Sequence, residues 1–221
     1  IGVGDCVAVP EFICRDLLAS LALVGAKPQY YPVDEKLGLA CSPSKIVNVK
    51  AIIAVNYFGF PQDLAPFEEV SQLTGAIIIE DNAHGFLSRD HVGMPLGTRA
   101  SLGVFSIRKT LPLVNGAALV VNNKKLSELL PEQRTPSLDY PLGAHVKHLF
   151  RKSVPTLGIQ GCQLMTAATR LSRKLRTGYA IQPQSMDAEV AIHPSSEPNE
   201  WSLGQMLKLD DCLEVSRRRM I

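Results

Sequence analysis

The chain has 221 residues, of which 46% are hydrophobic and 20% charged, and its net charge at pH 7 is +2. This is the composition of an ordinary globular protein, and it excludes a low-complexity or fibrous chain. No apolar run approaches the roughly 20 residues of a membrane span. The first residues also lack the charged start and apolar core of a signal peptide, so we expect no membrane association.

The cysteines are scattered along the chain, their number is odd, and no two form a C-x-x-C pair. They are Cys6, Cys14, Cys41, Cys162 and Cys212. This pattern argues against a disulfide framework and against a zinc site, so we expect no metal. It favours a reducing compartment, and we expect a cytoplasmic protein.

Up to about residue 125, short β-rich runs alternate with amphipathic helical stretches, which is typical of a parallel α/β sheet. We expect strands over 7–9, 29–33, 51–55, 76–80, 101–106 and 117–121. Helices are expected over 12–24, 63–73 and 124–130, with Phe12 in the apolar stripe of the first one. Gly25 and Gly75 follow two of these helices as C-caps.

After residue 130 the pattern weakens, because prolines break the chain into short pieces and 181–199 has loop composition. A single helix is expected from about Trp201 to Arg219, with its apolar residues forming a buried stripe. We therefore divide the chain into an α/β domain (1–130), a connecting region (131–200) and a terminal helix (201–221).

The segment 147–176 is basic, and no Asp or Glu lies between Asp139 and Asp187. Apolar residues interrupt its charges, and it matches no nucleic-acid-binding motif. A solvated helical face is the favoured interpretation, and its arginines could also meet substrate phosphates. We expect no nucleic-acid partner.

Three polar residues are expected at one edge of the sheet. The apolar strand 76–80 leads into Asp81 and His84, and Lys109 follows the β-run that ends near Ser106. Ligands of open α/β sheets bind at the carboxyl ends of the strands. An aspartate can keep a pyridine nitrogen protonated and a lysine can form a Schiff base, so the pattern predicts a pyridoxal phosphate (PLP) site. Each residue alone would be read as an ordinary loop or surface residue.

Several motifs in a fixed order make the chain resemble the DegT/DnrJ/EryC1/StrS aminotransferases. They are G-x-G-D-x-V-x-V-P at 2–10, G-A-x-P at 25–28, Y-x-G-x-P-x-D at 57–63, E-D-x-A-[QH] at 80–84, the glycine-rich stretch 97–103, F-S at 105–106 and the helix with Leu207–Leu209 and Arg217–Arg219. Members are fold-type-I PLP enzymes that mostly aminate keto groups of nucleotide-linked sugars.

The resemblance implies a three-layer α/β/α sandwich with a mostly parallel sheet, truncated at both ends. The family's phosphate-binding Gly-Thr-Ser segment would precede residue 1, and a small domain would follow residue 221. Lys109 would be the Schiff-base lysine, Asp81 the partner of the ring nitrogen, His84 a ring contact and Ser106 a phosphate ligand. A homodimer, an amino acid donor and a keto-sugar acceptor are implied, in polysaccharide or secondary-metabolite biosynthesis.

The chain departs from the family pattern at a few positions. Ser106 and Lys109 are spaced two residues closer than in typical members, and Cys14 stands where many members have an aromatic residue that stacks on the ring. Phe12 is a possible substitute for that aromatic. Branches that dehydrate replace the lysine with His, so Lys109 favours transamination. The alternative is a homologue that keeps the fold but carries out no cofactor chemistry.

Overall fold

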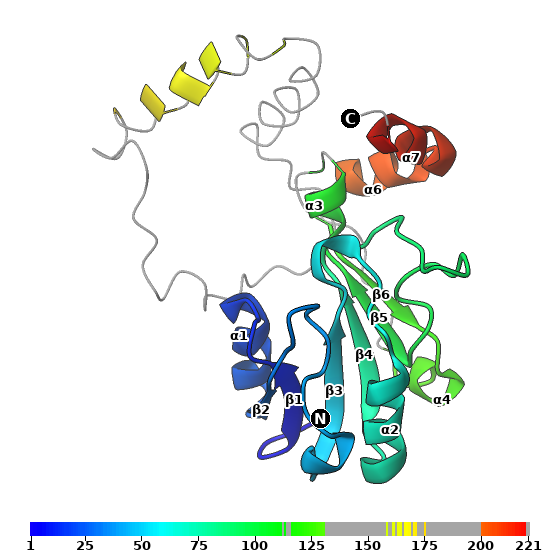
Figure 1. The fold of residues 1–221 in the computed structure, drawn as a ribbon. Helices are drawn as coiled ribbons and strands as arrows, with labels where there is room; N and C mark the ends of the chain where they lie inside the picture. The colour runs from blue at the N-terminus through cyan, green and yellow to red at the C-terminus, as the bar shows by residue number, and fades with distance from the viewer. Residues whose placement is uncertain are drawn as a thin grey trace.

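The computed structural model describes residues 1–111, 113, 116–130 and 200–219, with scattered residues between 158 and 175 (Figure 1). The elements in chain order are β1 (Cys6–Pro10), α1 (Arg15–Leu23), β2 (Lys27–Tyr31), η1 (Pro43–Lys45), β3 (Val49–Val55), η2 (Tyr57–Gly59), α2 (Ala65–Thr74), β4 (Ile77–Asn82), β5 (Leu102–Phe105), α3 (Ile107–Thr110), β6 (Ala118–Val121), α4 (Lys124–Ser127), α6 (Glu200–Leu207) and α7 (Asp211–Arg219). The connecting region and the basic segment lie almost entirely outside the described residues.

The strands form one sheet in the order β2-β1-β3-β4-β5-β6. Neighbouring strands are parallel, except that β6 runs antiparallel to β5. After β1 the chain forms β2 on one side and then crosses to form β3 on the other. The connections that leave β1 and β3 therefore diverge, and this leaves a crevice at their carboxyl ends.

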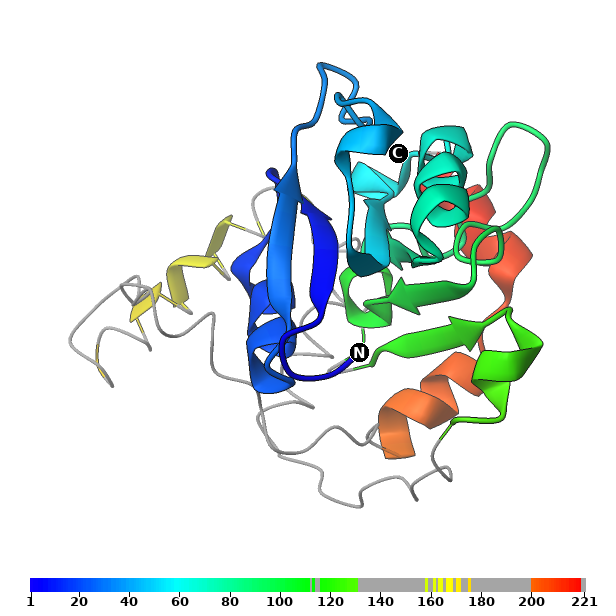
Figure 2. The same ribbon diagram turned by 90° about the horizontal axis from the view of Figure 1, so that it is seen from below.

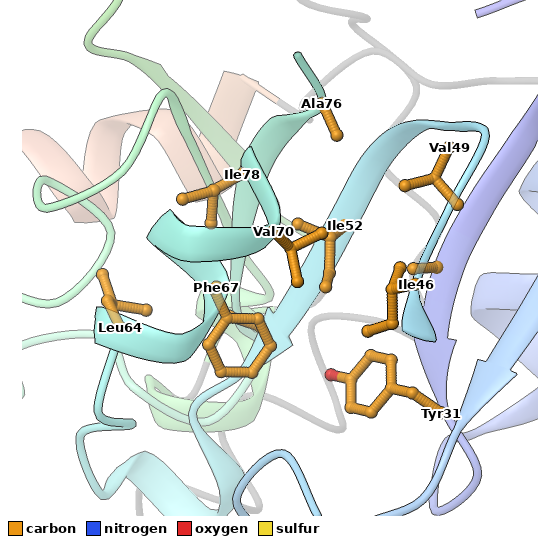
Figure 3. Packing of buried hydrophobic residues seen from close by; sticks show 11 residues of the cluster. Tyr31, Ile46, Val49, Ile52, Leu64, Phe67, Val70, Ala76 and Ile78 are labelled. Atoms are coloured by element: carbon orange, nitrogen blue, oxygen red, sulfur yellow. The ribbon is translucent and has the colours of Figure 1, made fainter. Parts of the chain in front are cut away.

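Helices cover both faces of this sheet, and α1 and α2 lie on opposite sides of it (Figure 2). Successive residues of a strand point to opposite faces, so β1 and β3 contribute to two separate cores. One core packs β-strand residues against Leu21 of α1 and includes Val7, Val9, Ala51 and Ile53. The other packs Ala8, Ile52, Ala54 and Ile78 against Phe67 and Val70 of α2 (Figure 3). The expected three-layer α/β/α architecture with a mostly parallel sheet is confirmed.

A third core cluster lies at the carboxyl end of β5. Phe105, Ile107, Leu111 and Leu113 are buried there. Trp201 and Met206 of α6 pack against them, together with Leu209. This contact brings the C-terminal helices next to α3 (Figure 1) and anchors the short helix that carries Lys109.

The single helix expected over 201–219 is wrong, because two helices form with a break at residues 208–210. Asp210 explains the break: its Oδ1 accepts a hydrogen bond from the Leu213 amide at 2.9 Å, as an N-cap residue does. The expected buried stripe is also incomplete, since Leu207 and Leu213 are exposed.

Other differences concern the ends of elements. The first helix begins at Arg15, so Phe12 lies outside it and is 53% exposed instead of buried in the core. The helix after β6 ends at Ser127. Asp81 is still part of β4, and Lys109 lies in the one-turn helix α3 rather than in a loop.

Candidate functional site

A cavity of about 300 Å³ opens at the crevice between the carboxyl ends of the strands. It is lined by residues from four connections that are far apart in sequence. They are Phe12, Ile13 and Cys14 after β1, Val55, Asn56, Tyr57 and Phe58 at the end of β3, Asp81, Ala83 and His84 at the end of β4, and Lys109 in α3. The structure therefore brings together Asp81, His84 and Lys109, which the sequence placed at one sheet edge.

Asp81 lies near the end of β4, where it pairs with Val55 of β3. Its Oδ1 accepts a hydrogen bond from the Ala83 amide at 2.9 Å, and its carbonyl accepts one from the Asn56 amide at 2.9 Å. Among the described residues, no group donates to its other carboxylate oxygen. One oxygen thus fixes the side chain while the other is available to a ligand in the cavity.

His84 is exposed at the cavity, and its ring lies parallel to that of Phe58. The ring centroids are 6.3 Å apart and the planes differ by 10°. Phe58 has a φ of 56°, a left-handed conformation that is uncommon for a bulky residue. The next residue, Gly59, approaches the His84 turn closely, because a Cβ there would lie 2.9 Å from the His84 carbonyl oxygen.

Lys109 is exposed on α3, and its amide donates to the Ser106 carbonyl at 2.9 Å. The buried Ile107 anchors this helix in the third core cluster. Ser106 precedes the helix, and its side chain makes no capping hydrogen bond. Ser106 is half-buried, and unlike the other three residues it is not among those that line the cavity.

Tyr57 and Phe12 line the cavity without having been assigned a firm role from the sequence. Their rings are stacked, with centroids 5.5 Å apart, and the Tyr57 hydroxyl donates to the Phe12 carbonyl. Burial and the nearby charge of Asp81 raise the pKa of Tyr57 to about 12. An aromatic residue directly after a buried strand, in the segment 57–63, is the sequence signal that could have marked Tyr57.

A polar network behind the cavity holds the ends of β3 and β4 together. Glu80 is fully buried and accepts from Nε and Nη2 of Arg99 at 3.1 and 2.7 Å. The Asn56 side chain donates to Glu80 and to Asn82, and its Oδ1 accepts from Arg99. Since Asn56 precedes Tyr57 and Glu80 precedes Asp81, this network fixes two walls of the cavity.

A protein-family model described as the DegT/DnrJ/EryC1/StrS aminotransferase family matches residues 1–148. The chain belongs to this family. The motifs between residues 2 and 106 that suggested the resemblance lie inside the matched range, whereas the helix with Leu207–Leu209 and Arg217–Arg219 lies outside it.

Solved structures of the family have the same fold. A DegT/DnrJ/EryC1/StrS aminotransferase from Brucella abortus is 22% identical, with a TM-score of 0.53, and the match covers 79% of this chain and 53% of that one. DesV of S. venezuelae is 23% identical, with a TM-score of 0.52 and coverage of 79% and 52%. The chain thus spans about half the length of these structures.

A GDP-4-keto-6-deoxymannose-3-dehydratase holding a trapped PLP–glutamate geminal diamine is also similar. It is 20% identical, with a TM-score of 0.51 and coverage of 58% of this chain and 35% of that one. That protein thus holds the cofactor that the sequence predicts, pyridoxal phosphate.

The described part of the chain contains no cluster of three or more residues suited to a metal ion. None of its helices combines the length and apolar character needed to cross a membrane. The four cysteines among the described residues are free thiols, and Cys14 is exposed at the cavity.

Proposed function

We propose that the chain is the PLP-binding part of an aminotransferase that moves an amino group from an amino acid to a keto sugar. The observation that carries the proposal is the cavity itself. Asp81 and Lys109 come from different strand ends and line the same pocket at the crevice of the sheet. Family membership supports the reaction class.

The lining suits a flat, charged heterocycle. The cavity offers one amine, one carboxylate and several aromatic or apolar side chains, and its volume of about 300 Å³ is at the small end for ligand pockets. A carboxylate matches the protonated nitrogen of a pyridine ring, and a lysine amine matches an aldehyde.

When bound, pyridoxal phosphate would supply an electron sink for the electron pair that remains at the substrate Cα when its proton is removed. Lys109 would hold the cofactor through its aldehyde carbon and, once displaced, act as the general base that moves the proton at the substrate Cα. Asp81 would keep the ring nitrogen protonated. His84 would contact the ring or its phenolic oxygen, and Ser106 would contribute to phosphate binding from the start of α3.

The finer assignments belong to the same proposal. A nucleotide-linked keto sugar as acceptor, an amino acid such as glutamate as donor and a homodimer agree with the family. A place in polysaccharide or secondary-metabolite biosynthesis would follow from such a substrate. A cytoplasmic location agrees with the free thiols of the described cysteines.

The test is covalent labelling of Lys109. Incubation with pyridoxal phosphate should produce a visible absorbance band, and borohydride reduction followed by peptide mapping should place the label on Lys109. Lys109→Ala should lose both signals. Lys124→Ala is the matched control, because Lys124 is also an exposed lysine in a one-turn helix but lies outside the cavity.

A protein without the band, or with the label on another lysine, would contradict the proposal. That result would favour the alternative of a homologue that keeps the fold without cofactor chemistry. The exposed thiol of Cys14 in the cavity is the feature that makes this alternative worth testing.

A further inference from the structure

Two pairs of stacked rings line the cavity. Phe58 and His84 form one of them, and Phe58 is 67% exposed. Phe12 and Tyr57 form the other stack. Tyr57 directly follows Asn56, whose amide donates to the Asp81 carbonyl at 2.9 Å, and Tyr57 and Asp81 line the same cavity. A ring whose nitrogen is held by Asp81 therefore lies near Tyr57.

Flat heteroaromatic rings gain stability by stacking on aromatic side chains. At position 14 the cavity offers a thiol, which has no flat face to stack against. Phe12 lies only two residues earlier in the same connection, and it is exposed at the cavity rather than packed in the core.

The Tyr57 hydroxyl links two of the connections that line the cavity. It donates to the Phe12 carbonyl across 45 positions of the chain and so joins the connection after β1 to the start of η2. With a pKa near 12, the phenol stays protonated at neutral pH and remains a hydrogen-bond donor. The hydrogen bond from the Tyr57 hydroxyl and the stacking of the two rings thus both hold Phe12 next to Tyr57.

We propose that Phe12 and Tyr57 together form the face on which the ring of the cofactor rests, and that the Tyr57 hydroxyl fixes the position of this face. We call the pair the Phe12–Tyr57 wall. The proposal deepens the function given above and rests on it, because it concerns how the same cavity holds pyridoxal phosphate.

Substitution of the two rings tests the wall directly. Phe12→Leu and Tyr57→Leu remove one aromatic face each but keep apolar volume. Phe60→Leu is the matched control, because Phe60 is 73% exposed on the neighbouring segment and does not line the cavity. Each wall variant should weaken the binding of pyridoxal phosphate about five- to tenfold, as expected for the loss of one aromatic contact, and Phe60→Leu should leave it unchanged.

The circular dichroism of the bound cofactor adds a second measurement, which at saturating cofactor does not depend on affinity. A ring fixed against the wall should show an induced signal in its visible band. At saturating cofactor, Tyr57→Phe keeps the ring but removes the hydroxyl, so we expect a weaker induced signal while borohydride still labels Lys109. The far-ultraviolet spectrum reports whether each variant is folded.

Cys14 provides an internal reporter of the same contact, because its exposed thiol lies in the same connection as Phe12. Bound cofactor should slow alkylation of Cys14 and leave that of the exposed Cys212 unchanged. At one fixed cofactor concentration, protection should be weaker in Phe12→Leu than in Phe60→Leu.

The outcomes separate the two proposals. If the unmodified protein binds the cofactor and is labelled on Lys109, but the wall variants match Phe60→Leu in affinity and in dichroism, the wall is refuted and the proposed function stands. If the unmodified protein gives neither band nor label, both proposals are refuted.

Discussion

At the scale of single residues, the charge of Asp81 acts on the cavity before any ligand binds. Burial first and the Asp81 carboxylate second raise the pKa of Tyr57 from its ordinary value to about 12. Because the folded state favours the protonated phenol, Tyr57 contributes stability that is complete below pH 10. This contribution is lost as the pH rises through about 12.

Asp81→Asn is expected to lower the pKa of Tyr57, because the asparagine lacks the charge that opposes ionisation of the phenol. The asparagine Oδ1 can still accept from the Ala83 amide, so the end of β4 should keep its shape. Alkaline titration followed at the tyrosinate absorbance measures the effect. In each background, subtracting the titration curve of the protein that also carries Tyr57→Phe isolates the transition of Tyr57. The same Tyr57 transition with and without Asp81→Asn would contradict the expected effect of Asp81 on the pKa of Tyr57.

Residue patterns predicted the polar residues that line the cavity better than its aromatic ones. Asp81, His84 and Lys109 were found because strand ends place polar side chains at one sheet edge. Phe12 was assigned to a helical stripe, since periodicity alone does not show that α1 begins three residues later. The hydrogen bond from Tyr57 to the Phe12 carbonyl joins distant segments, and no local pattern contains it.

At the scale of elements, β4 separates two kinds of carboxylate on its two faces. Asp81 lines the cavity, whereas Glu80 is completely buried behind it and paired with Arg99. The Arg99 and Ala100 amides also donate to Glu80 Oε1, at 2.9 and 3.2 Å. The segment after the 85–98 loop is thereby fastened to β4. In the sequence, the charged Glu80 at the end of the apolar run 77–79 is the signal that indicates a buried cationic partner.

Arg99→Met is expected to destabilise the fold by about 3–5 kcal/mol, because it leaves Glu80 buried without its cation. Arg89→Met is the matched control, since Arg89 is exposed and, within the described part of the chain, its side chain donates only to the Gly93 carbonyl. Urea unfolding followed by circular dichroism measures both. Adding Glu80→Gln to Arg99→Met should recover part of the loss, and equal destabilisation by the two arginine variants would argue against a special role for the pair.

Elements were predicted best where the hydrophobic pattern alone decides them. The continuous apolar run of β3 is buried on both faces, so its location was evident. The break between α6 and α7 depends on one capping side chain, Asp210, within a stretch whose periodicity continues. Similarly, α3 is a single turn held by tertiary packing of Ile107, and a four-residue helix has no periodicity to detect.

At the scale of the whole molecule, the crossover of the chain at β1 creates the site. Four connections meet at the carboxyl ends of β1, β3, β4 and β5, and the third core cluster places α6 against the helix of Lys109. A ligand that bridges these connections adds contacts between parts of the chain that are far apart in sequence. Its binding energy should therefore add to the stability of the fold as a whole.

Pyridoxal phosphate should consequently raise the thermal midpoint of unfolding. A ligand that binds only the folded state, at about 100 times its Kd, adds about 2.7 kcal/mol, which corresponds to a shift of roughly 5–10 °C for a chain of this size. Lys109→Ala should shift less with pyridoxal phosphate, because the covalent link is lost. Pyridoxamine phosphate has no aldehyde, so it should shift the unmodified protein and Lys109→Ala equally. Differential scanning calorimetry at matched ligand excess measures these shifts, and the absence of a shift in the unmodified protein with either compound would contradict a cofactor site at this cavity.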